Sequence, residues 1–242
     1  MLQYIRKGTG EVLVLVHGFL GAKEIFQDVI EDLSSHYDVI AVDLPGHGSS
    51  KLEKDRYTVY DYAQAVTEVL QHEGVTEATW FGHSLGGYIV LAALEGKVAP
   101  IKRAILAYSY HGADNEEQKE KRTKQQQQIP LIGVEPFVDQ LIGAFFSNNA
   151  KEEQIQFARQ IGYRASEEGL IVALEAMKSR PNQQNFVDNT TMPILVIEGS
   201  EDGIVQPIQT KNENVEKVIT KTGHLGMLED PKSFTEAVKQ FM

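Results

Sequence analysis

Short apolar runs alternate with amphipathic segments along most of the chain. The runs lie at residues 12–16, 39–42, 78–81, 104–108, 194–197 and 215–219. Helical spacing of apolar side chains is found at residues 23–34, 58–73, 85–95 and 231–241. Continuously apolar strands that alternate with helices are typical of a sheet buried on both faces. The pattern therefore predicts an α/β fold with a mostly parallel, twisted sheet and helices on both faces.

The alternation stops between residues 107 and 192, where the composition becomes helical and polar. Apolar residues there recur at i, i+3, i+4 and i+7 in two groups: Val138, Leu141, Ile142 and Phe145, and Leu170, Ala173, Leu174 and Met177. Each helix then has one apolar face that needs a partner. We predict a core domain of residues 1–110 and 192–242 with a helical cap inserted at 111–191. Phe145 and Phe146 are the candidate substrate-pocket residues of this cap.

The sequence Gly82-His83-Ser84-Leu85-Gly86 lies between one apolar run and a helical run of small residues. A serine at such a strand-to-helix turn has a strained backbone, and glycines two positions before and after it relieve the crowding. The first N–H groups of the helix stabilise negative charge on a nearby substrate oxygen. Because G-x-S-x-G also occurs by chance, its interpretation depends on a base and an acid elsewhere. Together with the candidate base and acid described below, the motif predicts a nucleophile elbow with Ser84 as the nucleophile.

A serine hydroxyl needs a general base, and His224 is the best placed of the histidines. It lies in a Gly-containing loop that follows the run at residues 215–219 and precedes a helix opening at Pro231. An ordinary imidazole, with a pKa of about 6.5, is largely neutral at pH 7 and can take the serine proton. The other histidines lie on predicted amphipathic helices or beside other motifs: His36, His72, His17, His47, His83 and His111. His224 is therefore the predicted base.

The acid that orients this base is predicted in the loop after the apolar run at residues 194–197. Asp202 lies in that loop, at the carboxyl end of a predicted buried strand. Two other carboxylates remain alternatives: the neighbouring Glu201, and Asp114 after the earlier predicted strand. The resulting chain order is serine, acid, histidine, which differs from both common orders of the serine proteases.

These motifs, taken in order, resemble those of the α/β-hydrolase superfamily over essentially the whole chain. The ordered set also includes His17-Gly18-Phe19 after the first long run and the segment Asp43 to Ser49 after the next. The chain is most similar to the small esterase, lactonase and carbon–carbon hydrolase branch. The resemblance implies an oxyanion hole formed by two backbone N–H groups, which here belong to Phe19 and Leu85.

The composition limits the classes of binding partner and the cellular compartment that can be expected. The 34 acidic and 23 basic side chains give a net charge of −11, which disfavours nucleic acid and anionic membranes as partners. The chain has no cysteine, so disulfides and thiolate chemistry are excluded. Its first residues lack the apolar core of a signal peptide, and a cytoplasmic protein is expected. The sequence has no metal-ligand spacing and no phosphate-binding loop, so no cofactor is expected.

The motifs predict acyl transfer to Ser84, with hydrolysis of a small or medium acyl ester as the first choice. Two alternatives stay open. One is a carbon–carbon hydrolase or menaquinone-pathway lyase with the same triad, whose acidic substrate would be bound by the arginines of the predicted cap: Arg122, Arg159, Arg164 and Arg180. The other is a non-catalytic ligand-binding receptor on this fold.

Overall fold

The computed structural model describes all 242 residues, and its centre is one seven-stranded sheet. The strands are β1 (Tyr4–Lys7), β2 (Val12–Val16), β3 (Asp38–Val42), β4 (Ala78–His83), β5 (Ile101–Ala107), β6 (Ile194–Gly199) and β7 (Val215–Thr220). They lie in the order β1-β3-β2-β4-β5-β6-β7, and every pair except β1 with β3 is parallel. The six predicted strands and the mostly parallel sheet are thus confirmed. The strand that sequence reasoning missed is β1, a short edge strand with three exposed residues and no apolar run.

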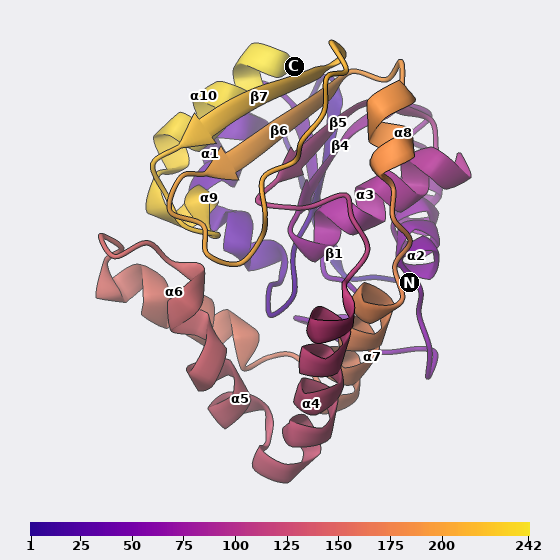
Figure 1. Cartoon of the computed structure of the whole chain (residues 1–242). Coiled ribbons are helices and arrows are strands. Elements are labelled where there is room, and N and C mark those ends of the chain that lie inside the picture. The colour runs from indigo at the N-terminus through magenta and orange to yellow at the C-terminus, as the bar shows by residue number, and fades with distance from the viewer.

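Helices cover both faces of the sheet (Figure 1). Two pairs pack side by side: α1 (Gln27–Ser34) with α10 (Pro231–Phe241), and α2 (Val59–His72) with α3 (Leu85–Gly96). The first predicted helix begins as a 3-10 turn, η1 (Lys23–Phe26), before α1. Phe81 of the fully buried β4 contacts Phe26 and Phe234 edge-on, at centroid distances of 5.6 and 5.4 Å. These aromatic contacts fix helices from both ends of the chain against the central strand.

The chain between β5 and β6 forms only helices. They are α4 (Glu116–Ile132), α5 (Val134–Leu141), the 3-10 turn η2 (Ile142–Phe145), α6 (Glu152–Gly162), α7 (Glu167–Lys178) and α8 (Gln184–Asn189), which we call the helical segment. In Figure 1, α4 to α7 lie together below the sheet, whereas α8 lies back at its level. The predicted apolar face of α7 is buried throughout, but the earlier apolar group continues from α5 into η2 instead of one regular helix. No helix of the protein combines the length and apolarity that a bilayer crossing requires.

Candidate active site

Ser84 occupies a strained turn between β4 and α3. Its backbone dihedrals are φ 51° and ψ −115°, which a non-glycine residue rarely adopts. A Cβ atom at Gly82 would lie 2.2 Å from the Gly86 carbonyl oxygen, and one at Gly86 would lie 2.2 Å from the Val16 carbonyl oxygen. Both positions therefore require glycine because backbones approach closely there. Ser84 thus has the strained strand-to-helix backbone that the sequence predicts.

Asp202 and His224 form a buried hydrogen-bonded pair. His224 Nδ1 lies 2.8 Å from Asp202 Oδ2, and the two side chains are 1% and 4% exposed. The other carboxylate oxygen of Asp202 accepts the backbone N–H of Ile204 at 2.8 Å, so the carboxylate is held from two sides. With Nδ1–H donating to the carboxylate, the neutral imidazole keeps an acceptor lone pair on Nε2. The structure thus brings the predicted base and acid together, and Glu201 is not part of the pair.

The other alternative acid, Asp114, lies in a different environment. Its fully buried carboxylate pairs with Arg122 and, at 2.6 Å, with Arg180. Burial raises the pKa of Asp114, but the hydrogen bonds and charges of the two arginines outweigh burial and hold this pKa below its usual range. Asp114 therefore has its own permanent cations and does not face His224.

His83 connects the elbow to the loop that carries His224. His83 Nε2 donates to the His224 carbonyl oxygen at 2.9 Å, and the two ring centroids are 5.0 Å apart. Burial, together with the neighbouring His224, places the pKa of His83 well below its ordinary value, so His83 is neutral. The sequence did not predict this contact of His83. The contact holds the turn with Ser84 against the loop with His224.

The loop after β2 lies directly against Ser84. A Cβ atom at Gly18 would lie 2.9 Å from the Ser84 Cβ and 2.6 Å from a ring nitrogen of His83. Phe19 follows Gly18, and its N–H makes no hydrogen bond within the chain. Leu85 opens α3, and the first amides of a helix have no intrahelical acceptor. The two amides implied by the family resemblance therefore belong to the two segments next to the serine.

His17 supports that loop through both ring nitrogens. Its Nδ1 donates to the Gly18 carbonyl oxygen at 2.8 Å, and its Nε2 accepts the Leu44 N–H at 2.9 Å. Complete burial lowers the pKa of His17 to about 3, so the ring is neutral and its tautomer is fixed by these bonds. Beside it, the buried Asp43 accepts from both the backbone and the ammonium group of Lys23. The loop after β2 is thus held rigidly at both ends.

A small apolar cavity of about 10 Å³ lies next to Phe19 and His83, and Ser84, Asp202 and His224 do not line it. Its walls are Phe19, Leu20, Gly21, Ile25, His83, Ile142, Phe145, Ala158 and Leu225. The Phe145 ring also meets the His224 ring edge-on at 5.4 Å. Phe146, the other pocket candidate, is buried and does not line this cavity. The cavity holds no more than about one water molecule.

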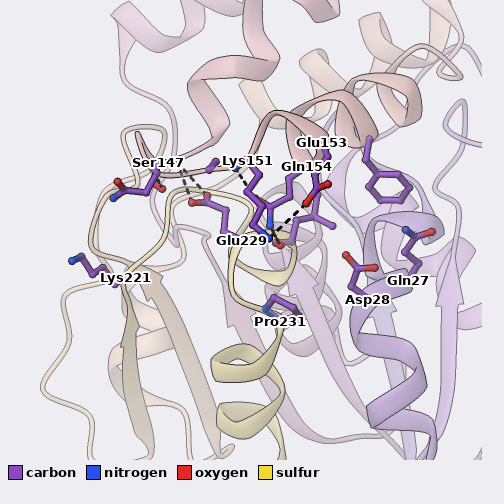
Figure 2. Close-up of a pocket in the computed structure, with 13 residues that line it drawn as sticks. Gln27, Asp28, Ser147, Lys151, Glu153, Gln154, Lys221, Glu229 and Pro231 are labelled. Carbon is purple, nitrogen blue, oxygen red and sulfur yellow. Dashed lines mark hydrogen bonds and ion pairs between the residues drawn. The ribbon is translucent and has the colours of Figure 1, made fainter.

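A wider and more polar hollow of about 510 Å³ lies elsewhere, between the helical segment, α1 and the residues after His224. Figure 2 shows Ser147, Lys151 and Gln154 on one side and Glu229 and Pro231 on the other. None of Ser84, Asp202 and His224 lines it.

The structure contains no group of three or more histidine, aspartate or glutamate side chains arranged to hold a metal ion.

The four arginines of the helical segment are all paired with carboxylates. Arg122 and Arg180 share Asp114, Arg159 binds Asp139 at 3.0 Å, and Arg164 binds Glu24 at 2.8 Å. Arg180 is also stacked on the Tyr88 ring, with the guanidinium carbon 4.1 Å from the ring centroid. Each guanidinium thus already has an acidic partner within the chain.

In α/β hydrolases the nucleophilic serine lies on a strand-to-helix turn at the carboxyl end of a central parallel strand. Ser84 has this position, between β4 and α3. The model of the alpha/beta hydrolase fold family matches residues 11–231. The chain belongs to this family.

Relatives and solved structures with similar chains include several enzymes. The chain is 26% identical to a putative 2-succinyl-6-hydroxy-2,4-cyclohexadiene-1-carboxylate synthase of Haemophilus influenzae, covering 94% of this chain and 95% of the relative. It is also 26% identical to a pimeloyl-[acyl-carrier protein] methyl ester esterase of Vibrio vulnificus, covering 99% and 97%. A thermophilic esterase from Thermogutta terrifontis, solved with malate bound, superposes with a TM-score of 0.92 at 25% identity, covering 99% and 92%. Homologues of this chain thus include esterases.

Proposed function

We propose that this protein is a serine hydrolase that cleaves a carboxylic ester through an acyl-enzyme at Ser84. The observation that carries the proposal is the position of the buried His224–Asp202 pair, on a loop that His83 bonds directly to the elbow of Ser84. This arrangement supplies a nucleophile, a base and an orienting acid from three separate loops.

In the proposed reaction, Ser84 Oγ attacks the ester carbonyl carbon while His224 Nε2 takes the hydroxyl proton. Asp202 stabilises the imidazolium that forms. The N–H groups of Phe19 and Leu85 bind the negatively charged carbonyl oxygen of the tetrahedral intermediate. The imidazolium then protonates the departing alcohol, and a water molecule, activated by the same base, hydrolyses the acyl-enzyme.

The small cavity supports a short acyl group as the substrate. Because it has room for only about one water molecule, an acyl group can enter it only if Ile142 or Phe145 moves, which favours short acyl groups. Both belong to η2, and we propose that residues 111–191 act as a cap that closes over the acyl group. The names of the esterase relatives agree with ester hydrolysis as the reaction class.

The arginine pairs bear on the carbon–carbon hydrolase or lyase alternative. A clamp for an acidic substrate needs a free cation, but the arginines considered for this purpose are bound to Asp114, Asp139 and Glu24. No specific contact therefore favours this alternative over ester hydrolysis, and it is kept as an outcome of the test.

The test combines covalent labelling with a substrate panel. A fluorophosphonate probe should add its mass to Ser84 in the wild type and not in Ser84→Ala, with the exposed Ser200→Ala as the matched control. Hydrolysis of p-nitrophenyl esters should be fastest with acetate or propionate and fall with chain length. Turnover of dienoic acids with no ester hydrolysis would favour the carbon–carbon alternative. Ligand-induced thermal stabilisation without labelling or turnover would favour the receptor.

A further inference from the structure

Glu229 ties the helical segment to the loop that carries His224. It is the last residue of α9 (Gly226–Glu229), a short helix that begins two residues after His224. Glu229 Oε1 accepts the Gly223 N–H at 3.0 Å, and both carboxylate oxygens lie 3.2 Å from the Ser147 N–H. One half-buried carboxylate therefore binds a backbone amide from each side of the contact. Figure 2 shows the side on which Glu229 meets Ser147.

The two backbones bridged by Glu229 are in direct contact. A Cβ atom at Gly223 would lie 2.6 Å from the Ser147 amide nitrogen, so only glycine allows this approach. One residue further on, the His224 N–H donates to the Phe145 carbonyl oxygen at 2.8 Å. The Phe145 ring also contacts the His224 ring. Residues 145–147 and 223–224 thus form one bonded unit, which we call the hinge contact.

A second bond runs parallel to the carboxylate. Gln154 of α6 donates from Nε2 to the Leu228 carbonyl oxygen at 2.6 Å, next to Glu229. The backbone of His224 is itself bonded on both sides. Its N–H donates to the Phe145 carbonyl oxygen, and its carbonyl oxygen accepts from His83 Nε2. A shift of the hinge contact would move the imidazole relative to the elbow.

We propose that Glu229 is a positioning residue that keeps His224 aligned with Ser84 by holding residues 145–147 of the helical segment against Gly223. The inference rests on the proposed function, because alignment matters only if His224 is the base for Ser84. Glu229 does not line the small apolar cavity beside Phe19 and His83. It acts by accepting two backbone hydrogen bonds, and its effect on catalysis is transmitted through the backbone of the hinge contact.

The experiment uses four variants of the full chain. Glu229→Ala removes both hydrogen bonds, Glu229→Gln keeps an acceptor oxygen without the charge, and Glu229→Asp is one methylene too short to reach both amides. The matched control is Glu153→Ala. Glu153 lines the same hollow, but its carboxylate pairs with Lys151 and bonds neither the Gly223 nor the Ser147 amide. For each variant, kcat, KM, Tm and the rate of fluorophosphonate labelling at Ser84 are measured.

For Glu229→Ala we expect kcat to fall by about 10- to 100-fold with KM within about twofold, since a misplacement of about 1 Å can cost about 10²-fold. The rate of Ser84 labelling should fall in parallel, Glu229→Gln should recover most of both rates, and Glu153→Ala should match the wild type. Should Glu229→Ala fail to fold, a lowered kcat in folded Glu229→Asp carries the same conclusion.

Wild-type kcat in Glu229→Ala, or in Glu229→Asp if the alanine variant does not fold, would overturn the proposal. Equal losses in Glu229→Ala and Glu229→Gln would also overturn it, because the charge and not hydrogen bonding would then matter. Failure of the proposed function is a separate result: the wild type itself would show neither Ser84 labelling nor turnover.

Discussion

The loops that follow β5 and β6 each carry an aspartate with a buried side chain. The two carboxylates bind different kinds of partner. Asp114 binds the guanidinium groups of Arg122 and Arg180, which are always charged. Asp202 binds the imidazole of His224 and the backbone N–H of Ile204. Both carboxylates lie near the carboxyl end of a parallel strand, so location alone does not distinguish them.

The difference between the partners is the reason that we propose a structural role for Asp114 and a catalytic one for Asp202. The charge of Asp114 is neutralised permanently, and its pair joins α4 and the residues after α7 to the chain that leaves β5. The charge of Asp202 faces a ring that can gain and lose a proton, so it can stabilise a cation that exists only during a reaction. Substitution of Asp114 should therefore lower stability, and substitution of Asp202 should lower turnover.

The largest effect is expected from Ser84→Ala, because it removes the proposed nucleophile. Its loss of turnover is the reference for the two aspartate variants. Ester turnover should fall by about 10⁴-fold or more, because nucleophile and base act as a unit. Circular dichroism and Tm should stay close to wild type, since both aspartate pairs are untouched. A variant that keeps most of its esterase activity would disprove the covalent mechanism.

The next effect is expected from Asp202→Asn. The amide keeps the size of the side chain but is the wrong hydrogen-bonding partner for the productive tautomer, and kcat should fall by about 10³- to 10⁴-fold. Steady-state kinetics checks this, with Glu201→Gln as the control at the neighbouring position. If Asp114→Asn or Glu201→Gln loses more activity than Asp202→Asn, the assignment of the acid is wrong.

Asp114→Asn should act on stability instead. Removing one partner of a buried ion pair leaves the other charge uncompensated, and we expect the free energy of unfolding to fall by about 3 kcal/mol. Urea denaturation measures it. The matched control is Asp139→Asn, which breaks the half-exposed pair with Arg159 and should cost less than about 1 kcal/mol. Equal losses in the two variants would contradict the structural role of Asp114.

The smallest effect is a pH dependence of that stability difference. The folded-state pKa of Asp114 lies below its ordinary value of 3.8, so its contribution is complete above that value and is lost as the pH falls through the folded-state pKa. The stability difference between wild type and Asp114→Asn should therefore shrink as the pH is lowered below about 4. Denaturation curves from pH 6 to pH 2 test it, and a constant difference would show that the carboxylate charge is not responsible.

Much of the fold could be predicted because each element depends on its own residues. Continuous apolar runs predict buried parallel strands, and all six were found, whereas β1 lacks such a run and forms by pairing with β3. The apolar face of α7 follows helical spacing and is buried as expected. The spacing at Val138 to Phe145 did not predict the change from α5 to η2, because the spacing marks the buried side and not the type of helical turn.

The sequence by itself pointed to the elbow of Ser84, and the steric demand on Gly82 arises within the turn, from the Gly86 carbonyl. The demand on Gly86 comes from the Val16 carbonyl oxygen of the neighbouring strand and is therefore tertiary. The sequence also placed Asp202 and His224 at strand ends. Only the tertiary structure decided that Asp202, and not Asp114, binds His224, and that Asp114 binds an arginine 66 residues further along the chain. It alone decided that Glu229 reaches an amide 82 residues away. The physical reason is that local sequence fixes backbone conformation, whereas partners so far apart are chosen by how the intervening helices and strands pack.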